Sequence, residues 1–237
     1  MPDRSTILAF DTSAAHCAAA LLDRGEIRAR VHEPMTRGQA ERLMPLLDEL
    51  MAIHGLTWVD LDAIGVGVGP GNFTGVRISV SAARGLAMGL GIPAISVSLF
   101  EVLRGPDSPR DTDPELVVLQ SQRAGLYTQF FTSGRPAGTP EPGANGYAAW
   151  SDIPAPSADR IRGAHATEIA KALTATGQGV FTGTDGTVPS DGGAEIIARI
   201  AAAKLALGQT GTPPAPLYLR PADAAPSSDV PPVLIDG

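Results

Sequence analysis

The chain has 237 residues, of which 43% are apolar, and its net charge is −7 at neutral pH. This composition can supply a buried core, and an acidic chain without a run of Lys or Arg does not fit strong binding to nucleic acid by itself. The single cysteine, Cys17, excludes an internal disulfide and a thiolate metal cage.

The N-terminal segment does not have the pattern of a signal peptide, because Asp11 and His16 interrupt its apolar run early. No stretch reaches the roughly 18 uninterrupted apolar residues that a membrane span requires. We therefore expect a cytoplasmic protein with no membrane association.

The first half of the chain predicts strands alternating with helices. Pro45 falls inside the first predicted helix, which should begin only a few residues before it or kink there. In chain order, the periodicities predict strands at 6–12, 17–22 and 26–31, a helix at 38–54, a strand at 64–69, a helix at 76–90, a strand at 94–97 and a helix from 99 to 103.

A segment rich in Pro, Gly and charge, 105–114, predicts a linker between two lobes at 1–104 and 115–220, followed by a flexible tail at 221–237. The second lobe predicts a smaller set of elements. These are strands at 116–120 and 126–131, a long loop over 133–159, and helices at 167–174 and 193–207.

The most specific stretch is the glycine-rich strand and turn at 64–75. Gly65, Gly67 and Gly69 leave one face of the strand bare, so we expect another backbone to pack closely there. Pro70-Gly71 predicts a turn, and the Thr74 hydroxyl is placed to cap the next helix.

Two interpretations of this loop stay open: the glycines serve packing and turn geometry, or free amides hold an anion. The loop lacks the Lys-Ser/Thr of a P-loop and the spacing of a dinucleotide fingerprint. Asp11 likewise either orders its own turn or coordinates a metal-bridged phosphate. The candidate residues for an anion site or structural turn are Asp11, Thr12, Gly69, Gly71, Asn72 and Thr74.

Two predicted helices have side chains beyond those that a single core-facing stripe would use. Apolar residues of helix 38–54 span about half its circumference, and helix 76–90 has a second stripe besides its apolar one. The second stripe is either a solvated face or an interface. The candidate interface residues are Leu43, Met44, Leu47, Met51, Arg77, Ser81, Arg84 and Met88.

Several motifs together resemble the TsaB family, accessory proteins of bacterial tRNA threonylcarbamoyladenosine (t6A) synthesis. The resemblance is dense over 6–103 and thin over 115–220, and GPGNFTGVR is its most specific part. The motifs are Asp11-Thr12-Ser13, AERLMP at 40–45, GPGNFTGVR at 69–77, Gly91-Ile92-Pro93 and Tyr218-Leu219-Arg220.

The resemblance implies an α/β fold of the actin-like ATPase (ASKHA) superfamily, with two ribonuclease-H-like lobes of which the second is degraded. It also implies a noncatalytic subunit that binds a TsaD-like transferase, helps to recruit a TsaE-like ATPase and forms a homodimer when alone. In that picture tRNA is contacted only through the complex, and ATP and metal belong to the partner subunits. The interface residues named above gain support, because the family pairs through these two helices.

The resemblance also indicates what is missing. TsaD holds a metal through two histidines in a V-N-H-L-E-G-H stretch, whereas this chain has Leu99 and Leu103 at those positions, so we expect no metal site. Family members carry Asp-Ala-Arg-Arg-Gly-Glu-Val-Tyr where this chain has Gln120, Gln122 and Gly125 in place of an acid, an arginine and a glutamate.

Two other functions are weighed against the accessory role. A small-molecule kinase would suit the superfamily, yet the chain lacks a glycine between Asp11 and Thr12, and its best candidate for a second phosphate turn, 184–187, has a loose context. A metallo-glycoprotease would need a motif such as His-Glu-x-x-His, which the chain does not contain.

Overall fold

The computed structural model describes residues 5–121, 125–142, 158–177 and 179–219. Gln122, the predicted tail at 221–237 and most of the predicted loop at 133–159 lie outside these residues. Among the helices of the described residues, none combines the length and the hydropathy that a bilayer crossing requires.

The first sheet has the strand order β3-β2-β1-β4-β5. Its first three strands form an antiparallel meander, and the last two run parallel to β1. All five strands match strands predicted from the sequence. They are β1 (Thr6–Asp11), β2 (His16–Asp23), β3 (Glu26–Pro34), β4 (Ala63–Gly67) and β5 (Ala94–Val97).

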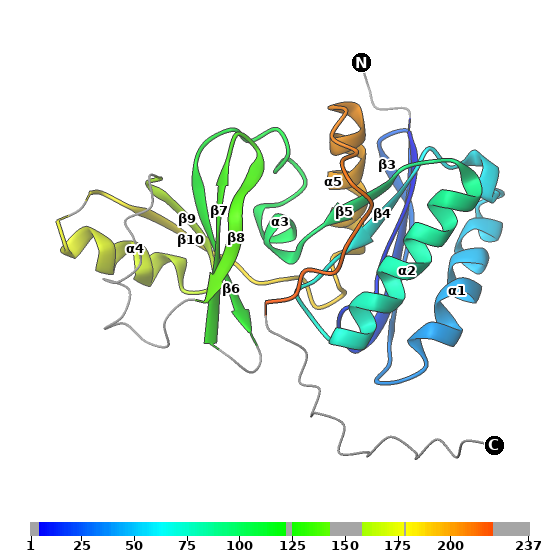
Figure 1. Cartoon of the computed structure of the whole chain (residues 1–237), viewed down its shortest axis with the longest axis horizontal. Coiled ribbons are helices and arrows are strands. Elements are labelled where there is room, and N and C mark those ends of the chain that lie inside the picture. The colour runs from blue at the N-terminus through cyan, green and yellow to red at the C-terminus, as the bar shows by residue number, and fades with distance from the viewer. Residues whose placement is uncertain (1–4, 122–124, 143–157, 178, 220–237) are drawn as a thin grey trace, which may run out of the picture.

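Helices cover both faces of the first sheet (Figure 1). α1 (Gln39–Ile53) and α2 (Phe73–Leu90) lie side by side on one face, and a short 3-10 helix, Trp58–Asp60, follows α1. α5 (Ala194–Ala206) covers the other face, where its buried alanines and isoleucines pack against β1, β2, β4 and β5. α5 lies within the range predicted for the second lobe. One face of the first sheet is therefore covered by a helix that comes after all the strands of the second sheet in the sequence.

The second sheet repeats the topology of the first. Its order is β10-β9-β6-β7-β8, with an antiparallel meander from β6 to β8 and parallel pairing of β9 and β10. α4 (Ala166–Ala175) packs on one face. The strands are β6 (Glu115–Ser121), β7 (Gly125–Thr132), β8 (Arg135–Pro142), β9 (Arg160–Gly163) and β10 (Thr182–Asp185).

This duplicated β-meander followed by parallel strands is the predicted actin-like fold, with a second copy that has fewer helices. The prediction of a loop from 133 onward was wrong for β8, whose three prolines and one glycine mask a strand at the sheet edge, where missing amides are tolerated. β9 and β10 were not predicted, because four residues each are too few to show a period.

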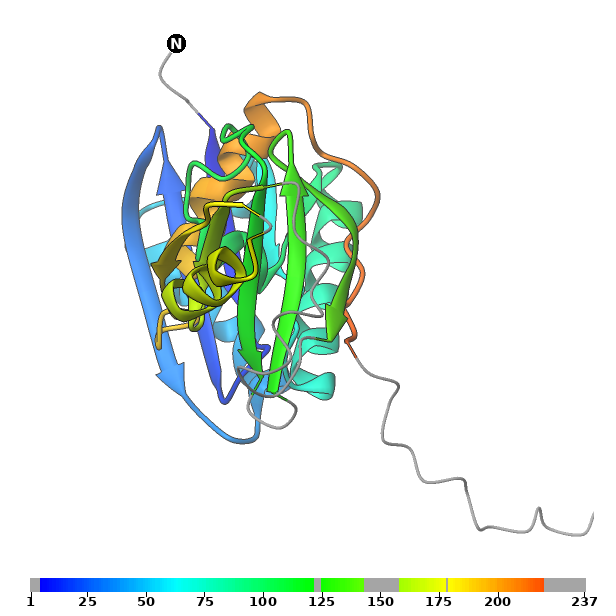
Figure 2. The same ribbon diagram turned by 90° about the vertical axis from the view of Figure 1, so that its left-hand side faces the viewer.

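Two segments connect the sheets, which stand one behind the other in Figure 2. α3 (Leu99–Arg104) follows β5 and packs against β6 through Phe100. The segment after α5 passes back along the first lobe (Figure 1), and the amide of Leu217 donates to the carbonyl oxygen of Val68 (2.9 Å). Leu217 contacts the cores of both lobes, so this segment joins them.

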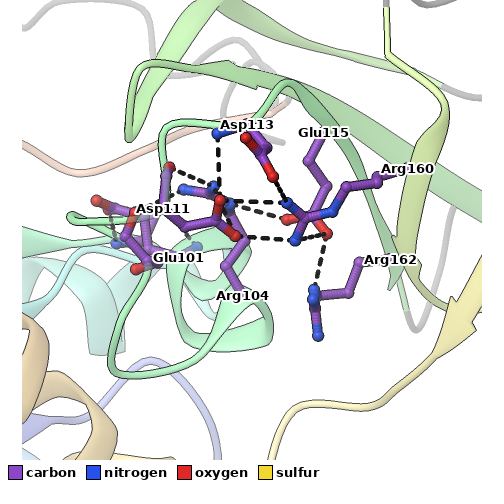
Figure 3. A network of polar contacts seen from close by, with 9 residues as sticks. Glu101, Arg104, Asp111, Asp113, Glu115, Arg160 and Arg162 are labelled. Atoms are coloured by element: carbon purple, nitrogen blue, oxygen red, sulfur yellow. Dashed lines mark hydrogen bonds and ion pairs between the residues drawn. The ribbon is translucent and has the colours of Figure 1, made fainter.

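A buried ion network fixes the predicted linker against the second sheet (Figure 3). The Arg104 guanidinium contacts Glu115 (Nε–Oε2 3.0 Å) and donates to the Ser108 carbonyl oxygen (2.9 Å), and both charged side chains are almost fully buried, at 1% and 2% exposure. Arg162 contacts the second oxygen of Glu115 (2.9 Å). Arg160 adds contacts to the carboxylates of Asp111 and Asp113 within the linker.

We expect Glu115→Gln to lower the free energy of unfolding by about 3 kcal/mol, because it leaves the buried Arg104 guanidinium without its carboxylate. Urea unfolding followed by circular dichroism measures this. Glu26→Gln is the matched control, since the Glu26–Arg28 pair is exposed and its loss should change stability by less than about 0.5 kcal/mol. Equal effects of the two substitutions would contradict the role given to the network.

Candidate functional site

The turn after β1 and the glycine loop after β4 dock onto each other. Thr12 donates its hydroxyl proton to the carbonyl oxygen of Gly75 (2.7 Å), and the amide of Asn72 donates to the carbonyl oxygen of Ser13 (2.6 Å). Parallel pairing of β1 and β4 brings both turns to the same end of the sheet. The sequence-predicted close approach of another backbone is therefore correct, and the partner is the Asp11-Thr12-Ser13 turn.

Three glycines allow this docking. A Cβ at Gly67 would overlap the Asp11 carboxylate, one at Gly71 would overlap the Ser13 carbonyl, and one at Gly75 would overlap the Thr12 carbonyl oxygen. The Pro-Gly pattern had suggested a left-handed backbone at Gly71. Gly69 has that conformation instead (φ 84°). Close packing, as in the first of the two interpretations, accounts for these glycines.

Asn72, not Thr74, caps α2. The Asn72 side-chain oxygen accepts hydrogen bonds from the amides of Thr74 and Gly75 (3.0 Å each), so the helix begins at Phe73, three residues earlier than predicted. Asn and Thr are both favourable N-cap residues. Asn72 is the cap here because the docked turn fixes its backbone. These amides already have acceptors within the chain.

Asp11 is fully buried at the end of β1. Its Oδ1 accepts the amide and hydroxyl protons of Ser13 (2.9 and 2.8 Å), and His16 Nε2 lies 3.0 Å from the same oxygen. Its Oδ2 faces Gly67 and has no hydrogen-bond partner in the described residues. The sequence analysis missed His16, although the short β1–β2 hairpin could have indicated it.

The residues present do not form a cradle for a nucleotide phosphate. Amides of Ser13, Asn72, Thr74 and Gly75 all donate within the chain, and the second candidate turn is also engaged. There the Asp185 carboxylate accepts the amide of Thr167 at the start of α4 (3.0 Å), which holds the pKa of Asp185 below its usual value. We derive no phosphate chemistry from these two turns.

The exposed face of α1 is narrower than predicted. Leu43, Leu47 and Met51 are buried in the first core with at most 2% exposure, so the prediction that they contact a partner is corrected. The apolar arc is wide because α1 packs against both the sheet and α2. Of the interface candidates on α1, Met44 is exposed.

On α2, the predicted stripe lies on the surface. Arg77, Ser81 and Arg84 are exposed, and Met88 is 85% exposed. The buried stripe of the same helix, including Val76 and Val80, faces the sheet.

The remaining chemistry-bearing residues have packing roles. Burial raises the pKa of the Cys17 thiol to about 11, so the nucleophilic thiolate is disfavoured. Leu99 and Leu103 pack in the core between the lobes, and within the described ranges no three His, Cys, Asp or Glu side chains are placed to hold a metal. Gln120 is exposed on β6, and Gly125 starts β7 with φ 79°.

Comparison with known proteins brings the motifs and the fold together. A family model described as TsaD, tRNA N6-adenosine threonylcarbamoyltransferase, matches residues 31–131. The chain is 44% identical over 93 residues to the tRNA threonylcarbamoyladenosine biosynthesis protein TsaB of Haemophilus influenzae, and 39% identical over 92 residues to that of Escherichia coli. Each match covers 39% of this chain and 39% of the relative.

The predicted resemblance to the TsaB family is confirmed. A solved structure, YeaZ from Pseudomonas aeruginosa, shares 26% sequence identity and superposes with a TM-score of 0.59 over 86% of this chain and 94% of that one. A putative N-acetylmannosamine kinase from Listeria monocytogenes, 12% identical with a TM-score of 0.52 over 85% of this chain and 99% of that one, shares the fold. The matched stretches to the curated TsaB proteins span well under half of their length.

Two glycines of α2 test the docking of the glycine loop. Gly75→Ala should lower the free energy of unfolding by at least about 2 kcal/mol, because its Cβ meets a backbone carbonyl that cannot rotate away. Gly85→Ala is the matched control: nothing lies within 4 Å of its Cβ, so it should raise stability by about 0.5–1 kcal/mol. Thermal and urea unfolding of both variants check this, and a tolerated Gly75→Ala would contradict the docking.

Burial of Cys17 predicts slow thiol chemistry in the native protein. At pH 8 we expect a disulfide reagent such as DTNB to modify Cys17 only as fast as the protein unfolds, because the thiol is inaccessible and its pKa is raised. Denaturant should restore rapid reaction. Rapid modification of the native protein, with unchanged circular dichroism, would show that β2 is not packed as described.

Proposed function

We propose that this chain is a noncatalytic accessory subunit of tRNA t6A synthesis. It would bind a TsaD-like transferase and help to recruit a TsaE-like ATPase, so that threonylcarbamoyl is transferred by the partner to the adenosine beside the anticodon. The observation that carries the proposal is the resemblance to TsaB proteins, together with the TsaD family model over 31–131, a range that includes the glycine loop, α1 and α2.

The geometry of the loop supports a role without chemistry of its own. The backbone groups that could approach a phosphate are engaged in joining the two turns, and their rigidity sets where α2 begins. The outer face of α2, with Met44 of α1, is exposed and available for contact with other molecules. We propose this face as the docking surface for the TsaD-like partner and for a second copy when the partner is absent, with tRNA reached only through the complex.

ATP and metal then belong to the partner subunits. In this proposal the chain stabilises one arrangement of the transferase by binding it more tightly than the others, which is a population shift and needs no reacting group here. The exposed stripe suits such a role, because it combines two arginines with the large apolar side chain of Met88.

A small-molecule kinase stays the alternative, and one observation favours it: Oδ2 of Asp11 is buried without a partner in the described residues. ATP hydrolysis or sugar phosphorylation by the isolated chain, abolished by Asp11→Asn, would support the kinase. Chelator-sensitive proteolysis by the pure protein would instead revive the metallo-glycoprotease.

Reconstituted t6A synthesis tests the accessory role. With the cognate TsaC-, TsaD- and TsaE-like proteins, we expect modification of tRNA to depend on this chain and to be lost in an Arg77→Glu/Met88→Glu variant together with binding to the TsaD-like protein. Val180→Glu is the control, since Val180 is 77% exposed and shortly precedes β10, a strand of the second sheet that lies away from α2 in Figure 1. Modification that proceeds equally well without the chain would refute the proposal.

A further inference from the structure

The Arg77 side chain is already held in one position on the surface of α2. Its guanidinium carbon lies 3.7 Å from the centre of the Phe73 ring, one helical turn earlier. Its Nε donates to the Tyr218 hydroxyl (2.7 Å), and the rings of Phe73 and Tyr218 are themselves 4.9 Å apart. Tyr218 is in turn fixed by the adjoining Leu217, whose amide is bonded to Val68.

The two terminal nitrogens of Arg77 have no hydrogen-bond or carboxylate partner in the described residues, and the guanidinium is exposed. Arg84, two turns further along the same stripe, also forms no ion pair there. Other arginines of the described residues are already paired with acids, which leaves them less able to bind a partner's carboxylate: Arg28, Arg30, Arg42, Arg104, Arg160, Arg162 and Arg199.

We propose that Arg77 is a preformed receptor for one Asp or Glu carboxylate of the partner protein, positioned by Phe73 and Tyr218. A planar guanidinium with two free amino groups matches a carboxylate through two parallel hydrogen bonds. Because stacking has already fixed the side chain, little conformational entropy remains to be lost on binding. This inference rests on the proposed docking of a TsaD-like protein at α2.

Charge and composition favour a protein carboxylate over other occupants. A tRNA backbone would meet an acidic chain and, on the described part of α2, two arginines that lie two turns apart, whereas a protein surface can offer single acids beside apolar residues that cover Met88. A second copy docked at the same face offers Arg77 no carboxylate from its own α2, because α2 contains no Asp or Glu. Arg84 would bind a second acidic residue of the partner protein, placed about 10 Å from the first along the axis of α2.

The experiment measures the affinity of the cognate TsaD-like protein for five forms of the full chain: wild type, Arg77→Lys, Tyr218→Phe, Arg84→Lys and the Arg77→Lys/Tyr218→Phe double variant. Lysine keeps the charge but loses the fork, so Arg77→Lys should weaken binding at least about tenfold. Arg84→Lys is the matched control, since Arg84 stacks on no aromatic ring of the described residues, and its affinity should stay within about twofold of the wild type. Tyr218→Phe should weaken binding by about three- to fivefold in the wild-type background and have no effect in the Arg77→Lys background.

The outcomes separate the inference from the proposed function. If Arg77→Lys changes the affinity for the TsaD-like protein by less than twofold, the receptor inference is wrong and the accessory role stands. Equal losses of affinity in Arg77→Lys and Arg84→Lys would lead to the same conclusion. No binding of the wild type would overturn both. If sedimentation or tRNA titration shows that Arg77→Lys weakens self-association or tRNA binding while partner binding is unchanged, the receptor belongs to another occupant and the inference is wrong. Unfolding midpoints and circular dichroism confirm that each variant is folded.

Discussion

The docking of the Asp11-Thr12-Ser13 turn onto the glycine loop is the constraint on which the first lobe depends. It joins the ends of β1 and β4 through hydrogen bonds on either side, from Thr12 to Gly75 and from Asn72 to Ser13. Because Asn72 is held by its backbone, its side chain caps α2 at a fixed place. The outer face of α2 is thus oriented by a contact on the inner side of the same helix.

The same contact engages several backbone groups at the ends of β1 and β4. An actin-like kinase needs backbone amides that are free to meet a phosphate, and here those groups satisfy one another. In the second lobe, the Asp185 carboxylate accepts the amide of Thr167 at the start of α4, so that amide is also engaged within the chain. Fold alone therefore says little about activity, and the exposed surface carries the functional argument.

The sequence predicted both the order of most elements and the close approach at Gly67, since strand periodicity and bare glycines are local signals. It could not identify the approaching backbone, which lies more than fifty residues away in the chain. Burial of Leu43, Leu47 and Met51 was missed for a similar reason: the width of an apolar arc does not reveal how many neighbours a helix has. β8 was missed because its prolines are permitted by an edge position that only the sheet order reveals.

The position of α5 has a consequence for synthesis on the ribosome. Until residues 194–206 leave the exit tunnel, one face of the first sheet, with the side chains of Ile7, Ala18 and Ile95 on it, has no cover. The nascent first lobe would therefore expose apolar surface while residues 104–193 are being synthesised, a condition in which chaperones commonly bind. The first sheet becomes fully covered only after α5 has been made, about a hundred residues after its own last strand.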